Sequence, residues 1–303
     1  SFRPQGLAAK AESLAARIRA AEADLVDLHP FHAGITGLLA ACLAGRPALL
    51  TFHGPTSLRL PGAEWHRATF ERLRLEARPV FVAVSPETRN LIRQAYSGTP
   101  LYVLANGVCR GGKALPWDGR TVAMATRLDP DKIPGVLDLL RLLQASPGLT
   151  LDLFGGGPAL PLVEAQIRTA GLTSRVRVHG HATDPACRFP RRALVAGCGR
   201  ALLEGLVQGR RGLVVSADAV IAPVTRARFA RLADANFSGR GLARTPHREI
   251  RAWLHRPCAE RVADLVPCDM PERWAAICSA TLANADPNRL QAAGQAVLSD
   301  LAG

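Results

Sequence analysis

The stretch from Thr121 to Pro158 constrains the fold more than any other part of the chain, because it reads as a complete βαβ unit. Its sequence is TVAMATRLDPDKIPGVLDLLRLLQASPGLTLDLFGGGP. The apolar run that ends at Arg127 predicts a strand, the periodicity of 136–143 predicts a helix, and the run 149–154 predicts a second strand before a glycine turn. In open α/β folds such a unit brings loops and helix N-termini to the carboxyl edge of a parallel sheet, where phosphorylated ligands bind.

Two cations and three consecutive glycines belong to the loops of this unit. Arg127 follows the first strand, and Lys132 comes five residues later. A guanidinium can hold a diphosphate through paired hydrogen bonds, and an ammonium adds a point charge. Gly155, Gly156 and Gly157 would let a run of free backbone N–H groups approach a ligand closely. A tight surface turn with two solvated cations is the alternative; the ordered combination favours a phosphate site.

The alternation of strands and helices continues on both sides of this unit and predicts two Rossmann-like layers with mostly parallel sheets. Further strands are expected at 24–29, 47–52, 80–84, 101–104, 175–179, 193–196 and 212–216. From about Thr225 helices dominate, among them one from Arg248 to Leu265. The irregular, Gly- and Pro-containing segment 109–119 suits a domain linker. We therefore expect domains at 1–112 and 113–284, and a C-terminal helix at 285–303 that crosses back to the first domain.

The net charge of +13 admits nucleic acid, an anionic membrane surface or a phosphorylated substrate as partner, and a solvated arginine-rich surface as the plain alternative. No nucleic-acid-binding signature is present, so no nucleic acid is expected as a partner. The seven cysteines form no CxxC pair and read as reduced core thiols, with no metal site. Without a signal peptide or a long apolar run, the sequence predicts a cytoplasmic protein.

A basic amphipathic segment, 64–78, offers Trp65, Phe70 and Leu73 as apolar anchors. Such a helix could dock on an anionic bilayer at the inner membrane face. More often a helix of this kind covers a sheet and keeps its cations in water, and that interpretation is favoured here.

Three histidines follow two predicted strands of the first half. His29 and His32 end one strand, and His53 ends the next. A single histidine at a strand end is usually structural, but three at the carboxyl ends of neighbouring strands would point into one crevice. That arrangement suits acceptor positioning or proton transfer. Metal binding is disfavoured, because no carboxylate or thiol completes a ligand set.

Glu204 lies in the predicted helix GRALLEGLVQ, among leucines that would pack its other face. A solvated carboxylate is the plain interpretation. Beside a phosphate site, a carboxylate is suited to accept hydrogen bonds from the two hydroxyls of a ribose, as acidic residues do in dinucleotide folds.

The order of the motifs resembles the retaining glycosyltransferases of family four, the glycogen-synthase-like type with GT-B architecture. The segments that carry the resemblance are DLVDLHPFHAG, PALLTFHG, FVAVSPETRNLI, LYVLANGV, MATRLDPDK, LFGGGP, RVRVHGHA and GCGRALLEGLVQGRRGLVVS. Each is modestly specific, and eight in the family's order cover nearly the whole chain. The resemblance implies an α/β fold of GT-B type, in which two Rossmann-like domains face a cleft.

The resemblance also implies a function, transfer of a sugar from a nucleotide-diphosphate donor to a hydroxyl of a sugar, lipid or small-molecule acceptor, with retention. No cofactor or obligatory metal is implied. Arg127 and Lys132 would hold the diphosphate, Glu204 the ribose, and His53 would lie near the sugar and acceptor. The remaining residues implied on the donor side are Gly155, Gly156, Gly157, His179, Gly180 and Gly199, and those on the acceptor side or hinge are His29, His32 and Asn106.

The sequence departs from the family pattern at several positions. Ala196 stands where the first of two paired glutamates is expected, Cys198 where an aromatic is usual, and Ile133 where a glycine follows the donor-loop lysine. The family's opening strand and glycine-rich loop are not found before Asp24, so the first domain is expected to be incomplete. A non-catalytic GT-B-like binding protein or an inactive fragment is therefore the alternative function.

Overall fold

The computed structural model describes residues 4–29, 34–58, 64–108, 113–256, 260 and 262–302. The chain forms two compact units: Ser1–Ala105 with Asp269–Gly303, and Asn106–Cys268. These divisions differ from the expected boundaries at 112/113 and 284/285. The reason is packing, because Val108 belongs to a core of the second unit and Ile277 packs on the sheet of the first.

The first unit is built on a four-stranded sheet in the order β1-β2-β3-β4, with every pair parallel. The strands are β1 (Val26–Leu28), β2 (Ala48–Phe52), β3 (Val80–Ala83) and β4 (Leu101–Val103). All four match strands expected from the sequence. Their side chains alternate between two apolar layers, as a sheet covered on both faces requires.

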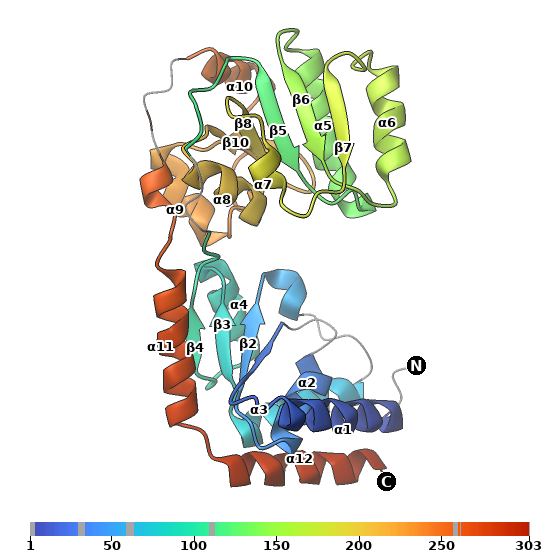
Figure 1. The fold of residues 1–303 in the computed structure, drawn as a ribbon, viewed down its shortest axis with the longest axis vertical. Coiled ribbons are helices and arrows are strands. Elements are labelled where there is room, and N and C mark those ends of the chain that lie inside the picture. Colours follow the sequence, from blue (N-terminus) through green and yellow to red (C-terminus); the bar gives the residue numbers. More distant parts are fainter. Residues whose placement is uncertain are drawn as a thin grey trace. The chain divides into compact units, whose positions relative to one another are not determined.

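Helices cover both faces of this sheet (Figure 1). They are α1 (Pro4–Ala20), α2 (Gly34–Leu43), α3 (Glu64–Ala77), α4 (Pro86–Ala95), α11 (Met270–Ala283) and α12 (Pro287–Ala302), with a 3₁₀ turn, η1 (Pro55–Leu58). One core gathers Leu50, Phe52 and Phe81 with α2, α3 and α12; the other places Ile277 of α11 on Leu49 and Val82.

Local sequence signals account for two of these helices. Ser85 is the N-cap of α4, and its hydroxyl accepts a hydrogen bond from the N–H of Thr88. Phe70 and Leu73 of α3 are fully buried, so these two residues are not available as membrane anchors. Arg72 and Arg74 of the same helix form ion pairs with nearby carboxylates. The structure therefore favours α3 as a covering helix. No helix in the described ranges is both long and apolar enough to cross a membrane.

The second unit contains a six-stranded sheet in the order β10-β9-β8-β5-β6-β7. The strands are β5 (Thr121–Ala125), β6 (Thr150–Phe154), β7 (Val176–Gly180), β8 (Leu194–Gly197), β9 (Gly212–Val215) and β10 (Val220–Pro223). Five strands run parallel and match the sequence expectation. β10 was not expected, and it pairs antiparallel with β9 at one edge.

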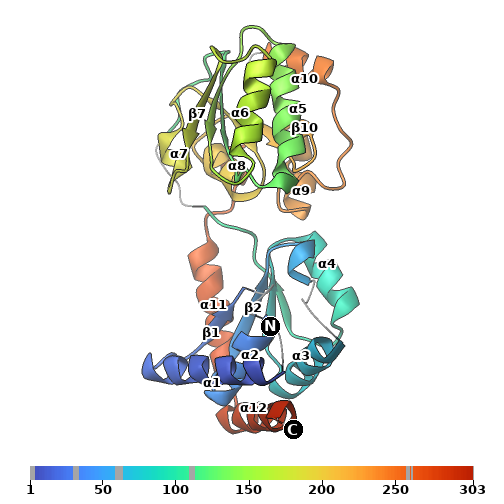
Figure 2. The same ribbon diagram turned by 90° about the vertical axis from the view of Figure 1, so that its right-hand side faces the viewer.

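Two apolar layers enclose this sheet. Figure 2 shows α5 (Ile133–Gln144) and α6 (Leu160–Thr169) side by side over one face, where α10 (His247–Leu254) also packs. The other face carries α7 (Pro185–Arg188), α8 (Gly199–Val207) and α9 (Arg226–Asp234). Short 3₁₀ turns, η2 (Pro130–Lys132) and η3 (Ala263–Leu265), complete the unit.

Three details of the second unit correct the sequence interpretation. Residues 185–188 form the short helix α7, between two predicted strands where no helix was expected. The helix expected from Arg248 to Leu265 ends at Leu254, where Arg211 donates hydrogen bonds to the carbonyls of Trp253 and Leu254 and so takes up C-terminal acceptors. Cys187 is free and exposed rather than a core thiol.

A buried carboxylate connects α5 to the segment that follows β9. Asp138 is 3% exposed, and its Oδ2 accepts hydrogen bonds from Val220 N at 2.9 Å, Arg244 NH2 at 2.5 Å and His247 Nε2 at 3.2 Å. Burial acts to raise the pKa of Asp138, but the Val220 hydrogen bond and the charges of His247 and Arg244 outweigh it and lower the pKa from its ordinary 3.8.

Asp138→Asn is expected to destabilise the second unit by about 1–3 kcal/mol at neutral pH, because the amide replaces a charged acceptor shared by three donors. A carboxyl group with a lowered folded-state pKa stabilises the fold above its unfolded pKa, and this contribution is lost as pH falls through the folded pKa. Urea unfolding from about pH 7 to about pH 3 measures both effects. Asp218→Asn, at an exposed carboxylate, is the control. A stability difference that does not shrink below about pH 4 would contradict this account.

Candidate functional site

The strand order of the second unit defines where a ligand can enter. The chain passes from β5 outward to β6 and β7, then returns to the other side of β5 to form β8 and β9. The helices that follow β5 and β8 accordingly pack on opposite faces of the sheet, α5 on one and α8 on the other. In open α/β sheets, ligands bind at the carboxyl edge at such a reversal of strand order. The crevice is therefore expected between the ends of β5 and β8.

The loop after β5 brings both predicted cations to this edge. Arg127 is largely exposed, and its NH1 lies 3.3 Å from Asp129 Oδ2. Lys132 is less exposed, and its Nζ lies 3.3 Å from Asp131 Oδ2. Each cation is thus held by a local carboxylate. An incoming anion can compete for these charges, because ion pairs at an exposed surface are weak.

The charge of Lys132 reaches the thiol of Cys198, which directly follows β8. Burial raises the pKa of the Cys198 thiol, and this effect exceeds the opposing influence of Lys132 and Arg240. The thiol therefore stays protonated near neutral pH. The loop after β5 and the start of α8 lie within electrostatic reach of each other.

The glycine turn after β6 is interlocked with the loop that carries Arg127. A Cβ added to Gly155 would lie 1.8 Å from the carbonyl oxygen of Thr126, and one added to Gly157 would lie 2.6 Å from that of Leu128. The N–H of Leu128 donates to the carbonyl of Gly156 at 3.0 Å. Only glycine permits this approach of two backbones. The turn thereby fixes the conformation of the cationic loop.

One expectation about this turn is wrong. The backbone N–H of Gly155 is not free for a ligand, because it donates to the carbonyl of Gly180 at 2.7 Å. The same bond places Gly180, at the end of β7, beside the turn. His179 on that strand stacks on Phe154 with ring centroids 4.3 Å apart and bonds through Nε2 to Asp152 Oδ1 at 2.6 Å. His179 is thus fixed at the outer strand of the sheet, on the face that carries α7 and α8.

Glu204 and Asn106 occupy the α8 side. Arg200 Nε donates to Glu204 Oε1 at 2.6 Å, so one carboxylate oxygen already has a partner. Asn106 Nδ2 donates to Asn236 Oδ1 at 3.0 Å, and the N–H of Gly199 donates to the carbonyl of Phe237 at 3.2 Å. The segment 236–237 thereby bridges Asn106 to the start of α8.

The sequence interpretation missed the role of Asn236 and Phe237. Both have left-handed backbone conformations, with φ of 52° and 53°. Asparagine is enriched in that region, which is a weak signal, and phenylalanine is not. Ala196, at the position expected for a glutamate, is fully buried at the end of β8 within the apolar layer that faces α5.

The first unit brings two of its three predicted histidines together. His29 Nδ1 and His53 Nε2 are 2.7 Å apart, at the carboxyl ends of β1 and β2. His32 lies outside the described residues. Asp27, which the sequence interpretation missed, lies with its Oδ2 at 3.3 Å from His29 Nε2. Thr51 donates its hydroxyl to Asp27 at 3.2 Å. We call these four side chains, Thr51, Asp27, His29 and His53, the histidine chain.

The feature of the sequence that could have revealed Asp27 is its position along the strand. Asp27 pairs with Leu49 and lies two residues before His29, so both side chains share one face of the strand. In the described part of the chain, no group of three or more His, Cys, Asp or Glu side chains is arranged to hold a metal ion. The geometry instead suits transfer or sharing of a proton between the two rings.

Burial lowers the pKa of His53 from 6.5, and the electrostatic influence of His29 lowers this pKa further, whereas Asp27 opposes both. His53 is therefore neutral at neutral pH and can accept a proton from a hydroxyl group or donate its own N–H. The neutral His53 ring is bonded to the His29 ring, and the Asp27 carboxylate contacts His29 in turn. This arrangement is suited to general acid–base catalysis.

Comparison with known proteins adds a family match over part of the chain and a fold. Residues 2–109 match the family model described as Glycosyltransferase Family 4. No curated protein matches the chain by sequence. Anabaena HepE in complex with UDP is 18% identical over 88% of this chain and 82% of HepE, with a TM-score of 0.55. A glycosyltransferase from Rickettsia africae is 14% identical over 100% of this chain and 83% of that protein, with a TM-score of 0.56.

A third solved structure is the pneumococcal O-GlcNAc transferase GtfA in complex with UDP and GlcNAc, 11% identical over 95% of this chain and 60% of GtfA, with a TM-score of 0.52. These three similarities establish the fold as that of GT-B glycosyltransferases, with two Rossmann-like units. The chain spans about half, 51%, of the length of TarM from S. aureus, which it matches with a TM-score of 0.49.

Gly155→Ala is expected to destabilise the second unit by roughly 1–3 kcal/mol or more, because the new Cβ would overlap the Thr126 carbonyl. Gly156→Ala is the matched control, since its Cβ would meet nothing closer than His181 Cβ at 3.7 Å. Thermal unfolding of both variants makes the comparison. Equal effects at the two positions would show that the turn and the cationic loop are not interlocked.

The contacts of the histidine chain predict how the pKa of His53 responds to substitutions of its neighbours. By NMR, His53 should titrate with a pKa below 6.5, Asp27→Asn should lower that pKa further, and His29→Gln should raise it. Since the folded-state pKa is lowered, protonation of His53 opposes folding. The stability associated with His53 is present above its unfolded pKa and declines as pH falls below about 6.5. A His53 pKa that responds to neither substitution would refute the coupling.

Proposed function

We propose that this protein transfers a sugar from a nucleoside-diphosphate sugar to an acceptor hydroxyl, with retention of configuration at the anomeric carbon. The observation that carries the proposal is the pair Arg127 and Lys132, presented by a loop that the glycine turn fixes at the reversal of strand order between β5 and β8. The family match over residues 2–109 supports it. HepE, which has a similar fold and was solved in complex with UDP, supports a nucleotide as a ligand of this protein.

Arg127 and Lys132 would bind the donor diphosphate after exchanging Asp129 and Asp131 for phosphate oxygens. As the bond from the sugar to the diphosphate breaks, negative charge grows on the leaving group. Fixed cations close to that charge stabilise the transition state more than the ground state. Two cations supply this charge directly, so we propose that the reaction has no obligatory metal. Turnover that persists in excess EDTA would support this, and turnover abolished by it would not.

The donor nucleoside would lie across the crevice from the cations. Glu204 keeps one carboxylate oxygen, Oε2, beyond the Oε1 bonded to Arg200, and it would accept a hydrogen bond from a ribose hydroxyl. The turn region near His179 and Gly180 would contact the base. Gly199, at the start of α8, would leave room for phosphate oxygens at the helix N-terminus.

The histidine chain of the first unit would serve the acceptor. A neutral His53 can accept a hydrogen bond or a proton from an acceptor hydroxyl, and His29 and Asp27 would hold its ring in place. Asp27 does not touch substrate in this proposal and acts as a positioning residue.

Isothermal titration with UDP, GDP and ADP tests donor binding. The combined change of Arg127→Ala and Lys132→Ala is expected to weaken the preferred nucleotide at least about tenfold, because each charge-assisted hydrogen bond contributes roughly 1.5–3 kcal/mol. Arg168→Ala, which removes an exposed arginine at the far end of α6, is the control and should leave affinity unchanged. Equal affinities in the two variants would place the nucleotide elsewhere.

Ala196 favours a second candidate, a GT-B-like protein that binds nucleotide without transferring sugar. A glutamate expected to contact the transferred sugar is replaced there by a methyl group that is fully buried. This candidate would be eliminated if the protein hydrolyses a sugar nucleotide or transfers sugar from it, and if His53→Ala loses that activity while it retains its affinity for UDP. Binding without turnover would favour it. Proton NMR of the first product formed would distinguish retention from inversion.

A further inference from the structure

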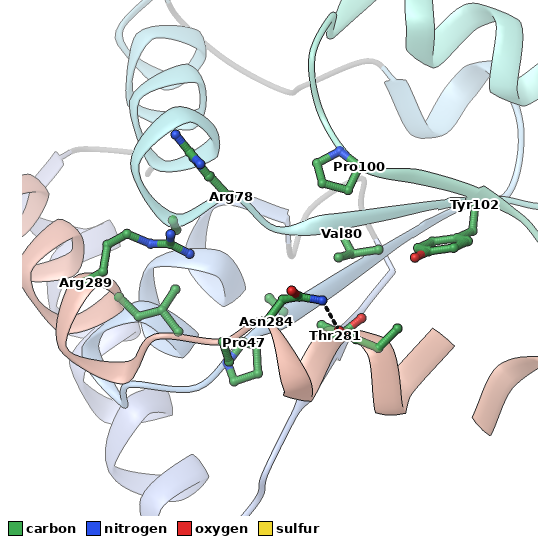
Figure 3. A pocket seen from close by; sticks show the side chains of 13 residues that line it. Pro47, Arg78, Val80, Pro100, Tyr102, Thr281, Asn284 and Arg289 are labelled. Carbon is green, nitrogen blue, oxygen red and sulfur yellow. Dashed lines mark hydrogen bonds between the residues drawn. The ribbon is translucent and has the colours of Figure 1, made fainter. Parts of the chain in front are cut away.

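A pocket lies in the first unit, at the edge of the sheet opposite the histidine chain. Its volume is about 400 Å³, and its walls include Pro47, Arg78 and Pro100, which precede β2, β3 and β4. The corner between α11 and α12 closes it with Asn284 and Arg289 (Figure 3). We propose that this pocket binds a small organic anion, with a phosphate or carboxylate group held by Arg78 and Arg289.

Arg289 is the inner cation. It lies in the first turn of α12, and in Figure 3 its guanidinium extends from that helix toward the segment that carries Arg78. Its Nε is buried and has no hydrogen-bond partner within the described ranges. A buried donor of a charged group without a partner is costly unless a ligand satisfies it. A cation at a helix N-terminus is also electrostatically unfavourable, so this position does not serve the stability of α12.

Asp286 is the acidic residue nearest to Arg289 in sequence at this corner. Its Oδ1 accepts hydrogen bonds from the backbone N–H groups of Asn288 and Arg289, each at 3.1 Å. That carboxylate is therefore used to cap the start of α12. Neither guanidinium has an ion pair with any residue that the structure describes.

Arg78 is the outer cation, and its backbone conformation is unusual. It follows the last residue of α3 with φ of 50°, in the left-handed region that glycine adopts most readily. Glycine at this position would end the helix with less strain. The arginine side chain is exposed at the rim, where Figure 3 shows it on the same side of the pocket as Arg289. An arginine in a position suited to glycine is consistent with a role for its side chain.

The remaining walls select for an anion with an apolar body. Pro47, Val80 and Leu290 are apolar, and the ring of Tyr102 lies at the far end from the arginines in Figure 3. The polar side chains there are directed to their own helix: Thr281 donates to the carbonyl of Ile277 and Asn284 to that of Ala280. The strong donors left for a ligand are the two guanidiniums, which match phosphate and carboxylate oxygens. The volume is within the range of small-molecule sites.

This site is independent of the proposed glycosyl transfer, because it shares no residue with the histidine chain or with the cationic loop of the second unit. The ligand could be a free metabolite or the headgroup of an anionic lipid, which present the same chemistry. The pocket would bind either through the guanidinium pair.

Titration calorimetry with phenyl phosphate on the full chain tests the proposal. We expect saturable binding with one site that is weakened at least tenfold in Arg78→Gly and in Arg289→Gln. Arg78→Gly should keep or raise the melting temperature, because glycine suits φ of 50°, so a loss of binding there cannot come from unfolding. Arg93→Gln, at an exposed arginine on α4, is the control for charge and should bind normally. Arg127→Ala with Lys132→Ala should also bind normally, which separates this site from the donor site.

Vesicles of phosphatidylcholine with and without phosphatidic acid provide the second arm. Sedimentation with the anionic vesicles that is lost in Arg78→Gly and Arg289→Gln would identify a lipid headgroup as the source. Binding of phenyl phosphate alone would indicate a free metabolite. Three outcomes would overturn the proposal. Binding could survive both arginine substitutions, it could be lost only in the Arg127 and Lys132 variant, or neither probe could show saturable binding.

Discussion

The contact between the glycine turn and the cationic loop is the constraint on which the second unit's site depends. Two backbones approach so closely at Gly155 and Thr126 that no side chain fits between them. Because the loop is held in this way, Arg127 and Lys132 project from a fixed base rather than from a flexible surface segment. Preorganised charge is more effective than mobile charge, since no ordering cost is incurred when the ligand arrives.

The two units contribute different chemistry. The second unit offers cations at the reversal of its strand order, whereas the first offers the neutral imidazole of His53, bonded to His29, which Asp27 contacts in turn. Negative charge that develops on a leaving diphosphate calls for the first kind of group, and the proton of an attacking hydroxyl calls for the second. This difference between the units follows from the sheets themselves, because each set of residues stands at the carboxyl ends of parallel strands.

The sequence predicted what depends on local patterns. The apolar runs of β5 and β6 and the histidines that end β1 and β2 are visible in short windows. It missed what depends on distant contacts. The end of α10 is set by Arg211, more than forty residues earlier in the chain. β10 is short, contains a proline and pairs at one edge, so no periodicity reveals it. The partner of the Gly155 N–H, Gly180, lies on another strand.

Hydrogen exchange measured with and without UDP tests the central claim most directly. If the crevice between β5 and β8 binds the nucleotide, exchange should slow in segments 126–132, 155–158 and 198–204, and the amino edge of the first sheet should not change. The account would be contradicted if, at a UDP concentration that saturates binding, exchange slowed only in the first unit. It would also be contradicted if exchange did not slow in the loop that carries Arg127 and Lys132.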